Sequence, residues 1–203
     1  MANVKVGLHV MSSRGLAVLT ALLKEFGADA ICYIVTSADP SNQNDYRAEI
    51  AAAAERAGVA CWERREAPPA MPAVRARFAV AWRWMLPVEQ AEPLVVFHDS
   101  LLPRYRGFAP LISSLVNAEP KLGVTALLGA ADYDTGPILG QEQVAVCYPL
   151  RIREALDAVQ PCYAKLAVRV LRDLAAEAWA PRAQDETQAT FDFEYSKFLP
   201  SMT

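Results

Sequence analysis

The sequence predicts a single α/β domain built on a twisted, mostly parallel sheet with helices on both faces. Two observations predict this class. Short runs of almost entirely apolar, β-branched residues alternate with longer segments of helical spacing, and strands that are apolar throughout are typical of parallel sheets covered on both faces. The chain also has 203 residues, 53% of them hydrophobic, which suits one domain with a sizeable core.

The first third of the chain alternates strand and helix. The apolar runs at residues 4–11, 28–37 and 59–64 predict strands because they are rich in Val, Ile and Tyr. The segments 16–27 and 46–58 have helical spacing, and each ends on a glycine, which is the usual residue just past a helix.

The rest of the chain continues the alternation and then adds two adjacent strands. The proline-rich residues 66–75 predict a surface loop. The remaining strands are expected at 77–84, 93–99, 123–133 and 137–146, and the remaining helices at 108–118 and about 152–178. The last two strands favour a hairpin-like element. Residues 1–180 are expected to form the catalytic domain, and 181–203 a C-terminal extension without a second fold, lying along the surface or fraying.

Composition excludes several classes of function. A net charge of −3 gives no basic footprint for nucleic acid, and no apolar run reaches the length of a membrane helix. None of the four cysteines forms a C-x-x-C pair, so we interpret them as small buried hydrophobes in a reducing compartment. We therefore expect a soluble cytoplasmic protein without a metal site, and apolar positions on the late strands would allow a homodimer.

His98 is the first candidate for chemistry. In open α/β sheets, ligands bind outside the carboxyl ends of the strands, which places residues 11–15, 82–86 and 98–100 on one rim. A histidine there either caps a strand end through a backbone carbonyl or acts as a general acid/base, because its pKa lies near neutrality. The pattern around His98 alone leaves both interpretations open.

Asp134 is the candidate partner of His98. It lies in "YDTGPIL", between the two late strands. A catalytic histidine needs a group that fixes its tautomer, and a carboxylate does this in the serine-protease triad. Asp-Thr-Gly is also an ordinary turn, since aspartate bonds its own backbone.

The motifs "VFHDSLLPRYRG", "GVT" and "DTG" occur in this order. Together they resemble the folate-dependent formyltransferase family, which includes methionyl-tRNA formyltransferase, glycinamide ribonucleotide formyltransferase and the sugar N-formyltransferases. The resemblance covers residues 78–139 well and the rest in outline. It implies a Rossmann-like fold and the transfer of a formyl group from the co-substrate 10-formyltetrahydrofolate to an amine, with His98 as the catalytic histidine and Asp134 orienting it and managing the proton through a water.

The resemblance also implies binding residues. The stretch "AWRWMLP" matches the part of the family that holds the pterin, although two tryptophans and a methionine can equally pack a core. "SSRG" stands where some relatives bind a substrate phosphate, or it is a plain helix N-cap. "RYRG" either contacts an acidic group or is a solvated loop. The residues expected to bind the folate are Trp84, Met85, Leu86 and Tyr133, and those expected to bind the substrate are Ser12, Arg14, Ser100 and Arg106.

Val96 departs from the family pattern. The family has an asparagine two residues before the histidine, where it donates a hydrogen bond to the formyl oxygen, and valine cannot donate. Losing one such donor typically costs about 10²–10³ in rate. Three explanations remain open: a donor such as Ser100, Thr135 or a backbone N–H replaces it, the chemistry differs, or the chain binds ligands without turnover.

The acceptor is the least determined part of the prediction. "QDETQAT" resembles the exit toward the C-terminal domain of tRNA-acting relatives, the given sequence ends at Thr203, and the chain is acidic. We therefore expect a small-molecule amine as acceptor. A hydrolase that releases formate from the folate and a formyltransferase-like binding protein are the alternatives.

Overall fold

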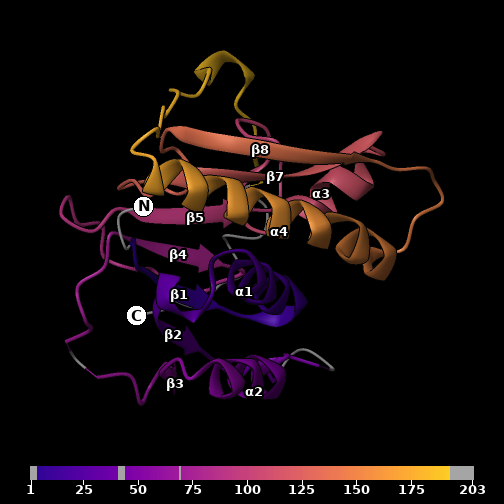
Figure 1. The fold of residues 1–203 in the computed structure, drawn as a ribbon. Coiled ribbons are helices and arrows are strands. Elements are labelled where there is room, and N and C mark those ends of the chain that lie inside the picture. The colour runs from indigo at the N-terminus through magenta and orange to yellow at the C-terminus, as the bar shows by residue number, and fades with distance from the viewer. Residues whose placement is uncertain (1–3, 41–43, 69, 193–203) are drawn as a thin grey trace.

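A seven-stranded sheet in the order β3-β2-β1-β4-β5-β7-β8 forms the centre of the structure, a computed structural model that describes residues 4–40, 44–68 and 70–192 (Figure 1). Its strands are β1 (Val6–Val10), β2 (Ile31–Thr36), β3 (Cys61–Glu63), β4 (Ala76–Val80), β5 (Leu94–His98), β7 (Lys121–Leu128) and β8 (Ile138–Ala145). The five strands from β3 to β5 pair in parallel, and β7 and β8 join antiparallel as a hairpin. The predicted class, a mostly parallel α/β sheet of Rossmann-like type, is confirmed.

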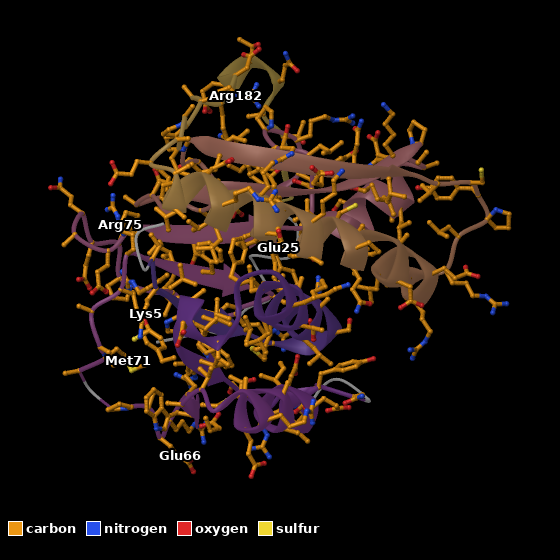
Figure 2. All side chains as sticks on the ribbon, viewed as in Figure 1. Lys5, Glu25, Glu66, Met71, Arg75 and Arg182 are labelled. Atoms are coloured by element: carbon orange, nitrogen blue, oxygen red, sulfur yellow. The ribbon has the colours of Figure 1, made fainter. Side chains whose placement is uncertain are left out.

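The helices pack on one face of this sheet. They are α1 (Ser12–Phe26), α2 (Arg47–Ala57), α3 (Pro110–Val116) and α4 (Ile152–Ala175), with short 3-10 turns η1 (Ala28–Ala30) and η2 (Glu186–Gln188). All four helices contribute to one buried cluster with alternate residues of the strands, such as Leu8, Phe78 and Val124. In Figure 1, α1 and α4 lie in front of the sheet. Glu25 of α1, labelled in Figure 2, forms an ion pair with Arg172 of α4 at 2.6 Å.

The opposite face is covered mainly by loops, which differs from the expected helices on both faces. There Tyr33 and Val35 of β2 pack against Trp82 and Met71, and Val96 of β5 packs with a second group of buried side chains. The physical reason lies in the connections. The β3–β4 and β4–β5 connections contain several prolines and form no helix, so the face over which they pass receives loops.

Two strands, β4 and β7, end several residues before the sequence suggested. β4 ends at Val80, because Ala81 adopts a φ of +52° that a strand cannot continue. Trp82 and Trp84 therefore leave the sheet instead of extending it. β7 begins at Lys121 and ends at Leu128, so the Asp134 segment lies in a loop rather than at a strand end.

The C-terminal segment does not fray where the structure describes it. Arg182 exchanges two backbone hydrogen bonds with Ile138 of β8 (2.7 and 2.9 Å). Further on, β9 (Phe191–Asp192) pairs in parallel with β6 (Arg106–Gly107), directly after the His98 loop. The expected extension 181–203 is thus docked as far as residue 192, and residues 193–203 lie outside the described part.

The cysteines only partly match the expectation of burial. Cys162 is buried, Cys32 and Cys61 are half-buried, and Cys147 is exposed, all as free thiols. Within the described ranges, no helix combines the length and apolar content needed to cross a bilayer.

Candidate active site

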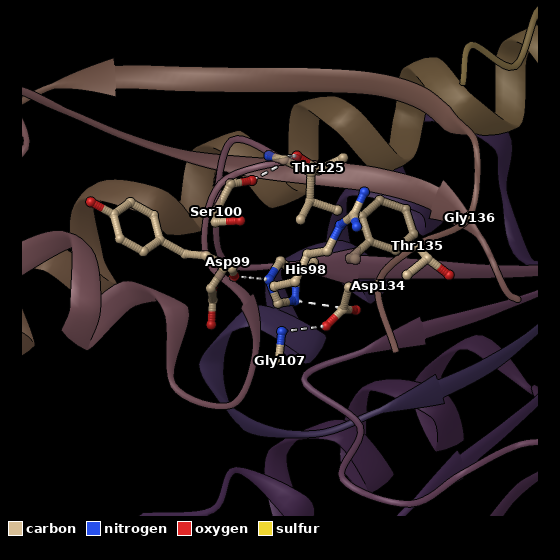
Figure 3. Close-up of polar contacts among 12 residues, drawn as sticks. His98, Asp99, Ser100, Gly107, Thr125, Asp134, Thr135 and Gly136 are labelled. Carbon is tan, nitrogen blue, oxygen red and sulfur yellow. Dashed lines mark hydrogen bonds and ion pairs between the residues drawn. The ribbon is translucent and has the colours of Figure 1, made fainter. Parts of the chain in front are cut away.

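His98 is the last residue of β5 and sits at the carboxyl edge of the parallel strands. Its side chain is 8% exposed. Nε2 lies 2.7 Å from the Tyr105 carbonyl oxygen, and Nδ1 lies 3.4 Å from Oδ1 of Asp134 (Figure 3). The predicted meeting of residues 98 and 134 therefore occurs. Because a carbonyl can only accept, Nε2 carries a hydrogen in this geometry.

Both ring nitrogens of His98 face oxygen acceptors. One ring proton is committed to Tyr105, so the contact with Asp134 gains a hydrogen bond only when Nδ1 also carries a proton. This arrangement holds the imidazole in a fixed orientation, with Nδ1 toward the carboxylate of Asp134. His98 also satisfies the structural role of capping a strand end through a carbonyl, so the two interpretations of the sequence coexist.

Asp134 is held in an uncommon backbone conformation that its surroundings enforce. Its φ is +56°, in the left-handed region that residues other than Gly, Asn and Asp rarely adopt. Its Oδ2 accepts the Gly107 N–H at 2.9 Å, which leaves Oδ1 for His98. Two residues on, a Cβ at Gly136 would lie 1.7 Å from the Leu128 carbonyl oxygen, so only glycine lets this loop run against β7.

Thr125 of the "GVT" motif fixes the turn that follows His98. It is fully buried beside His98 in the β5–β7 register. Its hydroxyl donates to the Ser100 carbonyl (2.6 Å) and accepts the Leu102 N–H (3.1 Å). A hydroxyl can donate and accept at once, which explains why a threonine suits this strand position.

Arg14 does not present a free charge to a substrate. Its guanidinium forms an ion pair with Asp99, and Tyr163 of α4 donates to the other oxygen of Asp99 at 2.7 Å. Burial by itself would lower the pKa of Arg14, but Asp99 and Tyr163 outweigh burial and leave that pKa raised. The structure therefore places Arg14 in a buried network that ties α1 and α4 to the residue after His98.

Three other residues expected at the substrate have structural partners. Arg106 is 1% exposed and forms hydrogen bonds with Gln184 and Glu186. The Ser100 hydroxyl is buried and donates to the Arg104 carbonyl at 2.7 Å, and the Ser12 hydroxyl accepts from Arg14 at 3.3 Å. Arg106 and Ser100 are therefore not placed to contact a substrate directly, because their donor groups already have hydrogen-bond partners inside the protein.

The residues expected to contact folate are only partly brought together. Trp84, Met85 and Leu86 line a cavity of about 200 Å³ on the loop-covered face, with His9 and Trp82 among its other walls. His98 is not among the described residues that line this cavity. Tyr133 is 67% exposed in the loop before Asp134, and Met85 is 59% exposed. Both are thus accessible to a ligand.

Lowering the pH is expected to destabilise the fold through His9. Burial, with repulsion from Arg77 as the smaller cause, lowers the pKa of His9 to about 4, whereas an unfolded histidine titrates near 6.5. Between about pH 6.5 and pH 4, His9 is protonated in the unfolded chain but not in the folded chain. The contribution of His9 to the free energy of unfolding is therefore present above about pH 6.5 and is lost as the pH falls toward 4. Urea unfolding should show about 2 kcal/mol less stability from this group at pH 5 than at pH 7.

The matched variant for this pH effect is His9→Phe, which keeps an aromatic ring without a titrating group. The difference in unfolding free energy between pH 7 and pH 5 should be smaller in the variant by about the same 2 kcal/mol. Carboxylates contribute equally to both proteins, so they cancel in the comparison. If the unfolding free energy of His9→Phe changed with pH as much as that of the unmodified protein, His9 would not be the source of the effect.

Val96 lies on the same face of β5 as His98, two residues earlier. Its side chain packs with Leu102, Leu127 and Ile138. The alternatives expected to donate in its place are occupied: the Ser100 hydroxyl as described, and the Thr135 hydroxyl by the Asp132 carbonyl at 3.1 Å. Backbone N–H groups remain as donors.

Several residues of the site were not identified from the sequence. The Tyr105 carbonyl and the Gly107 N–H act through the backbone, which leaves no signal in residue type. Asp99 follows His98 directly, yet its partner Tyr163 is 64 residues away. No group of three or more His, Cys, Asp or Glu placed to hold a metal was found in the described part of the chain.

The fold and site define an α/β protein with an imidazole–carboxylate pair at the carboxyl edge of a mostly parallel sheet. The formyl transferase family model matches residues 73–188, more than half of the chain and all of this pair. The chain belongs to the formyltransferase family.

The curated relatives that match this chain include methionyl-tRNA formyltransferases. The one from Deinococcus radiodurans is 42% identical over 93 residues, covering 46% of this chain and 29% of the relative. The one from Acidobacterium capsulatum is 28% identical over 179 residues, covering 88% of this chain and 53% of the relative. The matches thus span between about a third and about half of the length of these relatives.

Solved structures share the fold at low identity. An N-formyltransferase from Helicobacter canadensis, in complex with folinic acid and dTDP-3-aminofucose, has a TM-score of 0.76 at 17% identity, over 93% of this chain and 70% of that one. Glycinamide ribonucleotide transformylase 1 from Symbiobacterium toebii has a TM-score of 0.70 at 17% identity, over 91% and 96%.

Proposed function

We propose that this protein transfers a formyl group from 10-formyltetrahydrofolate to the amine of a small molecule. The observation that carries the proposal is the contact between Nδ1 of His98 and Oδ1 of Asp134 at the sheet edge. Membership of the formyltransferase family supports the reaction class. The folate donor is supported by the N-formyltransferase from Helicobacter canadensis, whose structure contains folinic acid.

The proposed reaction has one bond to form, one to break and one proton to move. The acceptor amine attacks the formyl carbon, an oxyanion develops, and the bond to N10 of the folate then breaks. The attacking nitrogen loses a proton and N10 gains one, so no other reactant is consumed. Asp134, whose side chain is 12% exposed, accepts the proton of the attacking amine through a water. His98, on the other side of the carboxylate, orients Asp134 through Nδ1.

A small amine fits the charges around the site better than a polyanion does. The two arginines that the sequence placed at the substrate, Arg14 and Arg106, are both paired with carboxylates, Asp99 and Glu186. Nucleic-acid binding usually depends on unpaired basic side chains that reach phosphates. This proposal is tested by turnover with candidate amines, followed by loss of formyl-folate absorbance, with a formylatable tRNA as the competing acceptor.

A catalytically impaired folate- or ligand-binding protein is the second candidate, and a formyl-folate hydrolase is the third. The observation that favours the second is Val96, which provides no donor and packs among apolar side chains. Hydrolysis would give formate in the absence of any amine, so a reaction without acceptor separates the hydrolase from the transferase.

Val96→Asn is expected to change kcat by less than about tenfold if a backbone N–H already binds the formyl oxygen. A new amide would then duplicate an existing donor, whereas restoring a missing donor is worth about 10²–10³ in rate. Steady-state assays of Val96→Asn should be compared with Val96→Leu, which has about the size of asparagine and no hydrogen-bond donor. A gain of 100-fold or more from near zero would support the impaired protein instead.

A further inference from the structure

The C-terminal segment 182–192 supports both groups that contact His98. Gln184 donates from Nε2 to the carbonyl oxygens of Asp134 (2.7 Å) and Gly136 (2.8 Å). Six residues later, the Thr190 hydroxyl accepts the N–H of Tyr105 at 2.8 Å, the residue whose carbonyl receives Nε2 of His98. The two supports of one imidazole are therefore tied to a single stretch of chain.

Every polar group of the Gln184 amide is used. Its two N–H groups go to the two carbonyls, and its oxygen accepts from Nε (3.0 Å) and a terminal nitrogen (2.8 Å) of Arg106. The opposite orientation of the amide would set N–H against guanidinium and oxygen against carbonyl, so the surroundings fix the amide one way. Gln184 thus connects the Asp134 loop to the strand that carries Gly107.

Arg106 locks the segment in place. It is among the most buried side chains of the described chain, and it binds both oxygens of Glu186 at 2.7 and 2.8 Å. Its backbone N–H donates to the Thr190 carbonyl, and β6 pairs with β9 at this point. A bidentate arginine–carboxylate pair sets a direction as well as a distance, which makes it suited to fixing a segment.

We propose that Gln184 is a positioning residue of the formyltransferase site: it holds the Asp134 loop so that Oδ1 faces His98. Aspartate visits the left-handed region more readily than most residues, and the Gln184 amide fixes it there by bonding the carbonyl of Asp134 and that of Gly136. The expected effect of Gln184 on turnover rests on the proposed function, whereas its expected effect on the position of Asp134 beside His98 does not.

The kinetic test is Gln184→Leu, which keeps the volume and removes all four hydrogen bonds. The expected result is a fall in kcat of about 10- to 100-fold, the scale of a displaced catalytic group, with KM for the formyl donor changed less than threefold. Gln188→Leu is the matched control, because Gln188 is exposed in the same segment and, among the described residues, its side chain bonds Asp185 alone (2.8 Å). An equal fall in both variants would overturn the inference, and so would an unchanged kcat in Gln184→Leu.

The second test needs no turnover. The chain has two histidines, so nitrogen NMR of labelled imidazoles gives one signal set for His98 and one for His9. Gln184→Leu should shift the nitrogen resonances of His98 and leave those of His9 in place. If the leucine variant does not fold, Gln184→Glu keeps the size and removes both N–H donors, and it should shift the same signals. Unmoved His98 resonances in the folded variant would overturn the proposal even if the protein has no transferase activity.

Discussion

Replacing His98 with alanine is expected to lower kcat for formyl transfer by about 10²–10⁴-fold, the usual contribution of a positioned acid/base group. The imidazole lies against Asp134 on one side and the Tyr105 carbonyl on the other, so its removal leaves the carboxylate without the ring that faces it. The measurement is steady-state turnover with formyl-folate and an accepted amine.

The control for this variant is ligand binding. Trp84 and Leu86 border a cavity that His98 does not line, so affinity for a stable formyl-folate analogue should stay within about threefold. A variant that binds the analogue but does not turn over places the defect in chemistry. Turnover retained within threefold in His98→Ala would contradict the role, and a native chain that binds without any turnover would favour the binding protein.

Replacing Asp99 with alanine is expected to destabilise the fold by about 3–5 kcal/mol, the cost of breaking a buried ion pair from one side. Asp99 is shared by Arg14 of α1 and Tyr163 of α4. Without the carboxylate, the largely buried guanidinium loses its ion pair, and the buried Tyr163 hydroxyl keeps the longer contact with the Phe97 carbonyl at 3.4 Å. Burial, and then Asp99, raises the pKa of Tyr163 well above its ordinary value, so the tyrosine stays neutral and cannot compensate the arginine. Urea unfolding at pH 7 measures the loss.

A second ion pair between the same two helices provides the control. Glu25 and Arg172 also join α1 to α4, but their side chains are 47% and 58% exposed. Glu25→Ala should therefore cost less than about 1 kcal/mol. Adding Arg14→Met to Asp99→Leu should recover part of the loss, because apolar pairs often replace buried ion pairs without cost. Equal losses in Asp99→Ala and Glu25→Ala would contradict the buried network.

The sequence by itself determined the class of fold, because strand and helix periodicities are local. Apolar runs and glycine stops placed β1, β2, β5 and the helices within a few residues. It also singled out His98 and Asp134, since a histidine at a strand end and an aspartate in a turn signal their chemistry through residue type and motif order.

Only the tertiary structure decided what the charged residues near His98 do. Arg14 and Arg106 look alike along the chain, as cations beside a motif, and the sequence offered both for substrate binding. Their partners Asp99 and Glu186 lie 85 and 80 residues away, and no local pattern encodes such pairing. The support of Asp134 by Gln184, 50 residues further on, has the same origin. A hydrogen bond forms only when donor and acceptor are placed to within a few tenths of an ångström. That placement is set by the packing of the whole chain.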